Sequence, residues 1–404
     1  MERTLTQSEV EVPKTFQKEG IERHSLFKQI WDFDLKKSNF RVSKTTKILV
    51  VLFGFCLWLL FSLKIQFINS ASSSESIRAF HQVDEIPFSK INDSIIPILI
   101  GLSFIRVLFG LIVGLLDIKL HRSITGKDFD WKGMVNIGFT NLAVFLFSFA
   151  FLIFTPLLPG FLAFYDTVIV SLPTVFNFNG VLAVIVAVVI GDFCFYWCHR
   201  ASHNIRFLWN LGHINHHRHE NLTQFHFAAE PNVLLLESSN LARLLLIPLL
   251  GKLFTFDIST VGWSLVVLLI IDTFIDPSHS PFLYSLENRF KALRYMRYIF
   301  VTAAVHYTHH SKEPRHSKKT GCNFSARLTI WDRLFGTYVE PDTELPETGL
   351  FGNKTDYCNN PIRFIFLPYY RFYLELKRNS IKHWIPIIFG STSYSPPVKA
   401  KISH

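Results

Sequence analysis

Charged residues are scarce in this sequence. Lys, Arg, Asp and Glu make up 18% of its 404 residues, against the roughly 25% that is usual for soluble domains. Apolar residues make up 49%, 41 of the residues are Phe, and the mean hydropathy is +0.26. This composition excludes a disordered chain, because such chains lack the apolar residues that form a core. It also argues against a purely soluble protein and predicts an integral membrane protein.

Cysteine is scarce as well, and several common motifs are missing. The five cysteines are odd in number and widely spaced, which predicts reduced thiols rather than a disulfide framework. No CxxC pair, HExxH or GxGxxG occurs, which argues against cysteine-based zinc sites, membrane zinc proteases and dinucleotide-binding folds. The N-terminal 47 residues are too long and too polar for a signal peptide. We attribute the net charge of +10 to contact with anionic lipid head groups rather than with nucleic acid.

Long apolar runs predict the membrane-spanning segments. Two weaker runs, 232–250 and 258–271, predict either a shallow helical hairpin or two further spans, since charges interrupt the first and the second reaches only 14 residues before Asp272. The predicted fold is therefore an all-α, polytopic membrane protein with four spans plus this hairpin and a cytosolic histidine-rich helical cap. The four predicted spans are 48–63, 95–116, 133–165 and 167–191.

The distribution of positive charge orients the chain. With a cytosolic N-terminus, 35 of the 41 Lys and Arg residues lie on the cytosolic side and four in the opposite loops. The histidine-rich region then faces the cytosol, in either a bacterial inner membrane or the endoplasmic reticulum. The predicted divisions are a basic cytosolic segment at 1–47, a transmembrane anchor at 48–184, a histidine-rich domain at 185–340 and a cytosolic extension at 341–404.

Histidine is abundant and clustered. Five of the 17 histidines fall within 199–217. One pair has the i, i+4 spacing that places two side chains on one face of a helix, and the pattern HxxHH occurs twice. If each HxxHH is helical, its three rings share one face. The result is eight convergent imidazoles, more than one metal ion needs and suitable for two. They are His199, His203, His213, His216, His217, His306, His309 and His310.

Metal binding is the favoured explanation of this cluster, because unbound rings would be unsatisfied polar groups at the bilayer edge. Structural zinc sites usually include Cys, and a bis-histidine haem would need single histidines deep inside facing spans. A metal transporter or sensor without redox chemistry stays open as the alternative. Such a protein would place His and carboxylates along its spans, yet the runs 48–63, 133–165 and 167–191 contain neither.

Four sequence motifs point to one family. They are DFCFYWCHRASH from Asp192, LWNLGHINHH from Leu208, IFVTAAVHYTHH from Ile299 and NFSARLTIWDRLFGTY from Asn323. The first three resemble the histidine boxes, and the fourth the closing signature, of the fatty acid hydroxylase/sterol desaturase superfamily. Its members are membrane-bound di-iron oxygenases.

The resemblance implies a chemistry. Two iron ions would be the cofactors, with another divalent metal such as zinc able to take their place in purified material. With O2 as co-substrate, the enzyme would hydroxylate or desaturate a membrane lipid (a sterol, fatty acyl chain or ether lipid) in lipid biosynthesis. No haem-binding HPGG stretch occurs, so we expect electrons from a separate cytochrome b5-like or ferredoxin-like protein.

The resemblance also adds residues to the expected site. His279, between the second and third boxes, is the candidate for a further ligand. Asp192 lies about two helical turns before His199 and is expected either to support a ligand or to lie at the membrane edge. His219 and His316 are expected to be solvated. The remaining candidates for supporting the ligands are Asn221, His226 and Asn323.

Overall fold

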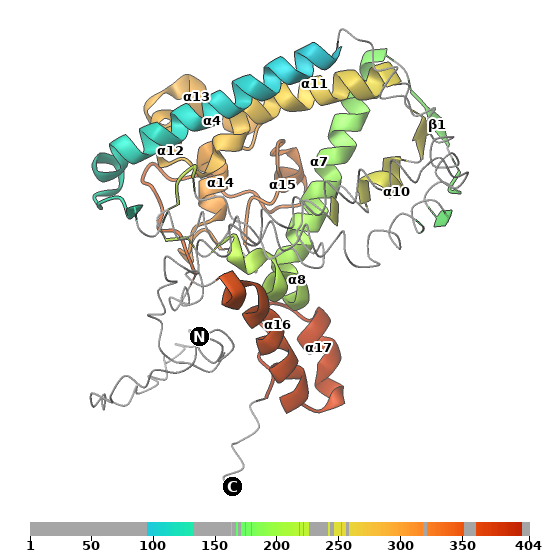
Figure 1. The fold of residues 1–404 in the computed structure, drawn as a ribbon, viewed down its shortest axis with the longest axis vertical. Coiled ribbons are helices and arrows are strands. Elements are labelled where there is room, and N and C mark those ends of the chain that lie inside the picture. The colour runs from blue at the N-terminus through green and yellow to red at the C-terminus, as the bar shows by residue number, and fades with distance from the viewer. Residues whose placement is uncertain are drawn as a thin grey trace, which may run out of the picture. The chain divides into compact units, whose positions relative to one another are not determined.

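The computed structural model of the chain is built from helices (Figure 1). Nearly all of the first and third predicted spans, 48–63 and 133–165, and the whole N-terminal segment 1–47 lie outside the residues that it describes. The described residues are 95–131, 180–217, 258–317, 321–350 and 361–397, with shorter pieces at 134, 163, 167–168, 171–173, 175–178, 219–220, 222–225, 241–242, 246–251 and 253–255.

Two described helices are long and apolar enough to cross a membrane, and their segments are Pro97–Thr125 and Gly180–Asn204. The first belongs to α4 (Ile95–Thr125), which extends well past the predicted end at residue 116. Gly126 ends α4 with a φ of 73° and donates its N–H to the carbonyl of Arg122, the usual left-handed helix end. Large apolar side chains cover the outside of α4, as expected of a helix that faces lipid.

The second membrane-crossing candidate is α7 (Gly180–Asn204), which begins later than the predicted position 167. Before it, strand β1 (Phe176–Asn177) pairs in parallel with β2 (Phe254–Thr255), and α11 (Ile258–Ile275) follows β2. Because β1 precedes α7 and β2 precedes α11, helices α7 and α11 start at the same end of the structure.

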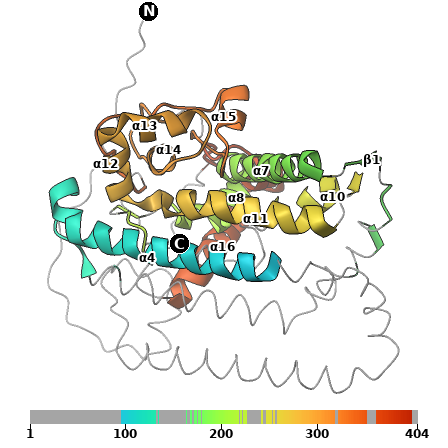
Figure 2. The same cartoon turned by 90° about the horizontal axis from the view of Figure 1, so that it is seen from above.

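Helix α11 packs along α4 and α7 (Figure 2). It continues into the 3-10 helix η6 (Asp276–His279) and then bends by 104° into α12 (Pro281–Arg289), so this bent pair is a third candidate span. Ser280 caps α12 by accepting the N–H of Leu283, and a proline follows at the first helical position.

An ion-pair network joins the three long helices. Arg327 bonds to both carboxylate oxygens of Asp272 on α11, at 2.6 and 2.8 Å, and Arg106 on α4 lies 3.9 Å from the same carboxylate. The backbone N–H of Arg327 in turn donates to Asp192 on α7. A charge inside an apolar helix is tolerated when a partner compensates it, which explains Arg106 within its run.

The weaker run 232–250 is described only in part. Helix α10 (Ile247–Gly251) and Ala242, five residues before it, pack against α7 around Cys194 and Cys198. All three described cysteines, Cys322 included, are buried free thiols, in agreement with the prediction of reduced thiols.

Shorter helices follow the C-terminal ends of the long ones. Leu222, Tyr284, Ala304 and Tyr307 form a small core between them. Beyond α8, the C-terminal helices α16 and α17 are joined to the rest by Arg206, whose guanidinium bonds to both oxygens of Glu375. These elements are α8 (Arg206–Leu211), η4 (His213–Asn215), α13 (Lys291–Tyr295), η7 (Met296–Tyr298), α14 (Ala303–His309), α15 (Ile330–Leu334), α16 (Pro361–Arg378), η8 (Ile381–His383) and α17 (Trp384–Phe389).

Candidate metal centre

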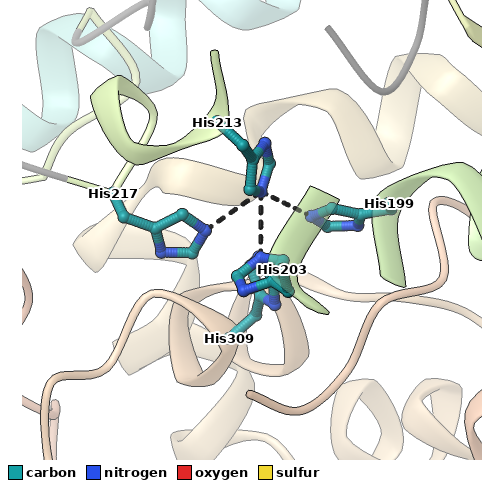
Figure 3. A group of neighbouring side chains, drawn as sticks. All are labelled: His199, His203, His213, His217 and His309. Atoms are coloured by element: carbon teal, nitrogen blue, oxygen red, sulfur yellow. Dashed lines mark hydrogen bonds between the residues drawn. The ribbon is translucent and has the colours of Figure 1, made fainter. Parts of the chain in front are cut away.

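Five buried histidines from distant parts of the chain converge on one point (Figure 3). His199 and His203 come from the end of α7, His213 and His217 from the turn after α8, and His309 from α14. The Nε2 atom of His213 lies 3.0 Å from that of His199, 2.9 Å from that of His203 and 3.2 Å from that of His217. We call these five residues the first histidine group.

Four more histidines form a second group beside the first. They are His216, His279, His306 and His310. The Nε2 atoms of His279, His306 and His310 lie 3.0 to 3.2 Å from one another. Within each group all candidate ligand atoms lie within 4.8 Å of one another. The two groups adjoin, since the ring centroids of His217 and His310 are 4.4 Å apart.

The crowding of nitrogen atoms fits a bound cation. A ring nitrogen carries either a proton or a lone pair, so Nε2 of His213 cannot satisfy three other Nε2 atoms at once. Nε2 of His309 is buried and has no hydrogen-bond partner. Two histidines that bind one ion at about 2.0–2.1 Å in tetrahedral geometry have nitrogens roughly 3.3 Å apart, close to the observed spacing. A metal ion therefore fits the donor atoms of each group.

Backbone carbonyls set the orientation of two rings. Nδ1–H of His199 donates to the carbonyl of Phe324 at 2.7 Å, and Nδ1–H of His309 donates to that of Cys322 at 2.6 Å. With the proton on Nδ1, each Nε2 presents its lone pair to the first group.

Burial keeps the imidazoles neutral, which is the form that binds metals. Removal from water lowers the pKa of His309 to about 4. Burial is also the largest cause of a lowered pKa in other histidines of both groups, and the neighbouring imidazoles lower it further. The histidines outside the long helices whose pKa lies well below the ordinary value for these two reasons are His213, His216, His217, His306 and His310.

One loop, residues 321–328, carries both of the orienting carbonyls, and we call it the strap. Asp332 on α15 holds its first half. Its carboxylate accepts the N–H of Phe324 at 2.7 Å and that of Ser325 at 2.9 Å, and it also accepts the hydroxyl of Thr337 at 2.7 Å. The positions of the His199 and His309 rings therefore depend on this buried acid.

Two of the expected supporting residues hold the rest of the strap. Asp192 on α7 accepts the N–H groups of Arg327 at 2.9 Å and Leu328 at 3.0 Å. Asn323 has a left-handed backbone, with φ 54°, and its amide donates to the carbonyl of Val305 on α14 at 3.2 Å. Asp192 is thus fully buried and bonded to backbone.

A buried carboxylate also fixes the start of α14. Glu287 accepts the N–H of Ala304 at 3.1 Å and the hydroxyl of Thr302 at 2.7 Å, and Arg297 pairs with the same carboxylate. The free N–H groups of a helix start attract an acid in this way, and the helix then presents His306 at a fixed angle.

Asp117, in the last third of α4, fixes the backbone that follows His279. Its carboxylate accepts the Ser280 hydroxyl and the N–H groups of Phe282 at 3.0 Å and Gln224 at 2.9 Å. Because Ser280 follows His279 directly, this carboxylate links α4 to the second group.

Comparison with known proteins gives this region a family. Residues 184–337 match the fatty acid hydroxylase family model. These residues form a fatty acid hydroxylase domain. The chain is also similar to alkylglycerol monooxygenase from Xenopus tropicalis, with 26% identity over 162 residues. The matched region is 39% of this chain and 31% of that relative. No solved structure matches the chain.

The family resemblance expected from the motifs is confirmed over this range, and the structure shows how the hydroxylase domain distributes its histidines. Each HxxHH is divided between the two adjoining groups. His216 and His309, the middle histidines of the two motifs, each join the other group from their neighbours. The second box lies on the 3-10 helix η4 and the turn after it, and the third box lies on the α-helix α14 and its C-cap. His279 lies in the second group.

Two other expectations for the hydroxylase domain are corrected. His316, expected to be solvated, is 3% exposed and bonds at 2.8 Å to both the Ser311 hydroxyl and the Asp342 carboxylate. His219 is buried as well. Asn221 and His226 lie outside the described residues.

His316 also belongs to a third cluster of possible metal ligands, with Glu313 and Asp342. Arg315 already compensates this cluster, because its guanidinium lies 2.6 Å from Glu313 and 3.0 Å from Asp342. We therefore treat it as an ion-pair network.

Sequence reasoning did not single out three acids of this region, Asp117, Glu287 and Asp332. Asp117 follows an apolar run directly, and an acid at that position is a signal that could have been used. Asp332 lies inside the closing motif. Nothing in the local sequence distinguishes Glu287 from a surface residue.

Proposed function

We propose that this protein is a membrane-bound, O2-dependent oxygenase that uses two iron ions to hydroxylate or otherwise oxidise a lipid. The observation that carries the proposal is the pair of adjacent histidine groups, five residues and four, inside a fatty acid hydroxylase domain. The names of the matched family and of the relative from Xenopus tropicalis favour insertion of oxygen over desaturation.

The donor set supports a redox-active pair of metals. Imidazole nitrogen suits iron, copper, nickel and zinc, and all nine donors are of this kind. A structural zinc site is closed by four ligands that usually include Cys, whereas the first group alone offers five histidines. Two irons bound here, reduced by an external donor, would supply the oxidising power needed to convert an unactivated C–H bond with O2.

The chain's own residues would position and shield this chemistry. The strap fixes the rings of His199 and His309, and the first group is buried throughout. His216, His279 and His306 of the second group are only half-buried. We place the approach of O2 and of the lipid on the side of the second group, while the sealed first group excludes water.

The proposed substrate is the hydrocarbon part of a membrane lipid that reaches the site from the bilayer. Ether lipids are the first candidates to test, because alkylglycerol in the name of the relative is such a lipid. Sterols and fatty acyl chains are the next. Each turnover needs two electrons from outside, and we propose a cytochrome b5-like or ferredoxin-like donor protein.

Metal analysis and turnover test the proposal together. The full-length protein, purified in detergent under nitrogen and loaded with ferrous iron, should hold two irons per chain. With a reductant, O2 and alkylglycerol it should form an oxidised lipid. His309→Ala should lose iron from the first group and His279→Ala from the second, and both should abolish turnover.

His383→Ala is the matched control, because His383 lies on η8 outside both groups and its ring bonds to the Tyr394 hydroxyl. It should keep its iron and its activity. Tight binding of a redox-inert metal, with no O2-dependent product from any of the three lipid classes, would instead support a metal transporter or sensor.

A further inference from the structure

Large apolar side chains are exposed on the surface that η7 and α15 form together. Leu334 is 67% exposed, Tyr298 64% and Ile299 58%. Tyr295 and Ile330 are exposed to a similar degree. We call these five residues the apolar patch. Isolated exposed apolar residues are normal, but a contiguous set indicates a binding surface.

The patch is contiguous across two segments of the chain. The rings of Tyr295 and Tyr298 stack with their centroids 6.1 Å apart. The N–H of Thr329 donates to the carbonyl of Ile299 at 3.0 Å, which places η7 beside the start of α15. The two segments therefore present one surface.

Positive charge surrounds the patch. Lys291, Arg294 and Arg333 are exposed, and the guanidinium of Arg333 lies 5.3 Å from the ring centroid of Tyr298. No acidic residue occurs from 288 to 300. Tyrosine, aliphatic side chains and Lys or Arg side chains with apolar stems are the combination found where proteins meet the membrane–water interface.

The patch is also continuous with a membrane-crossing candidate. Trp331 of α15 packs on Phe193 of α7 and Phe335 packs on Trp197, each pair with ring centroids 5.0 Å apart. Trp197 lies 17 residues after the start of α7, or roughly 26 Å along the helix axis. A hydrocarbon core is about 30 Å thick, so α15 lies beside the part of α7 where the helix would leave it.

We propose that the apolar patch is inserted in the interfacial layer of the membrane. Its tyrosines and aliphatic side chains contact the upper acyl chains, and Lys291, Arg294 and Arg333 contact anionic lipid head groups. Because Ile330 closely follows the strap, this contact anchors the strap against the bilayer. The proposal concerns membrane contact alone and does not depend on the metals or on the reaction.

Spin labels test where the patch lies. The full-length protein, with Cys56 and Cys358 replaced by Ser, is placed in nanodiscs of phosphatidylcholine and phosphatidylglycerol. Labels at Leu334→Cys and Ile299→Cys should be accessible to O2 but protected from a water-soluble nickel chelate. A label at Val181→Cys, 78% exposed on α7, should behave in the same way. A label at Thr343→Cys, in an exposed loop, should be accessible to the nickel chelate.

Charge reversal tests the role of the cations. Lys291→Glu with Arg294→Glu should raise the nickel accessibility of the Leu334 label, and more so in discs with phosphatidylglycerol than in pure phosphatidylcholine. Lys382→Glu, on the distant η8, is the matched control and should leave the label unchanged. If the Leu334 and Ile299 labels are as accessible to nickel as the Thr343 label, the proposal is wrong. Labels that become protected only when a donor protein is added would assign the patch to that protein.

Discussion

His316 illustrates how a polar side chain away from the metals stabilises the hydroxylase domain. Both of its ring nitrogens are bonded, one to Ser311, which directly follows His310 of the second group, and one to Asp342. The ring thereby joins the segment after α14 to the loop near residue 342. Its place in the structure is that of an interior hydrogen-bonded residue, not of a ligand.

We expect His316→Ala to destabilise the protein by about 1–3 kcal/mol, because two polar partners lose their bond to a buried ring. Bound metal per chain should not change. The unfolding midpoint in detergent and metal analysis check both expectations. His383→Ala is the control, since that ring is less buried and bonds to one hydroxyl. Equal losses of stability in the two variants would contradict this account of His316.

Gly321 is a glycine whose backbone lies close to a histidine of the first group. Its φ is 131°, a conformation that side chains rarely adopt, and a Cβ there would lie 3.2 Å from Nδ1 of His203. Gly321→Ala should therefore displace His203 and lower the metal content of the first group. Metal per chain after dialysis against a chelator measures the effect.

Gly126→Ala separates backbone strain from contact with the ligand. Gly126 also has a positive φ, of 73°, but a Cβ there would meet nothing within 4 Å. The Gly126→Ala variant should lose some stability and keep its metal. If both glycine variants retain metal equally well, contact with His203 is not what Gly321 provides.

At the scale of the elements, buried carboxylates tie three segments that carry or orient histidines of the two groups. Glu287 holds the start of α14, Asp117 holds the turn after η6, and Asp192 and Asp332 hold the strap. Fixed hydrogen bonds of this kind keep metal ligands in one orientation before the metal binds.

Asp332→Asn should loosen the strap while preserving the volume of the side chain. The amide has one acceptor oxygen where the carboxylate uses two, so one strap N–H faces an NH2 group. Because hydrogen bonds to charged groups contribute about 1.5–3 kcal/mol, we expect a loss of roughly that size. We also expect faster release of metal to a chelator, because His199 and His309 lose their fixed carbonyls.

Asp128→Asn is the matched control for the strap. Asp128 lies three residues after the end of α4, its side chain is 84% exposed, and it pairs with Arg122 at 3.6 Å. Exposed pairs of this kind contribute little to stability. If Asp332→Asn releases metal at the rate of the wild type, the strap contributes only to general stability and this prediction is contradicted.

At the scale of the whole molecule, the long helices share one direction. Ionic and hydrogen-bonded contacts pair Arg106 with Asp272 and Asp117 with Ser280, so α4 and α11 run in parallel. Strands β1 and β2 place the starts of α7 and α11 together. All three helices therefore end on the side of the histidine groups.

Labelling from the two sides of the membrane should reveal this arrangement. Ser123→Cys, near the end of α4, and Ser391→Cys, which lies beside Ile205 after α7, should react from one side, and Ser171→Cys, before β1, from the other. The distribution of Lys and Arg predicts that the shared side is the cytosol. Reaction of all three from a single side would rule out crossing by α7.

The sequence by itself determined which residues bind metal in this proposal and what kind of protein holds them. Composition and long apolar runs predicted a helical membrane protein, because both reflect local properties of the chain. The i, i+4 spacing and the HxxHH motifs identified histidines that the structure brings together, since neighbours in sequence are neighbours on a helix. The family resemblance rested on the same local patterns.

Only the tertiary structure decided how those histidines divide and what holds them. His309 joins residues of α7 and η4, and His279 joins those of α14, through packing between distant segments. Asp192 lies 135 residues from Arg327, the strap residue whose N–H it accepts. No local sequence pattern encodes such a bond, because it forms only when α7 and the strap pack together in the folded chain. For the same reason His316 and Glu287 read as surface residues in the sequence and are buried in the fold.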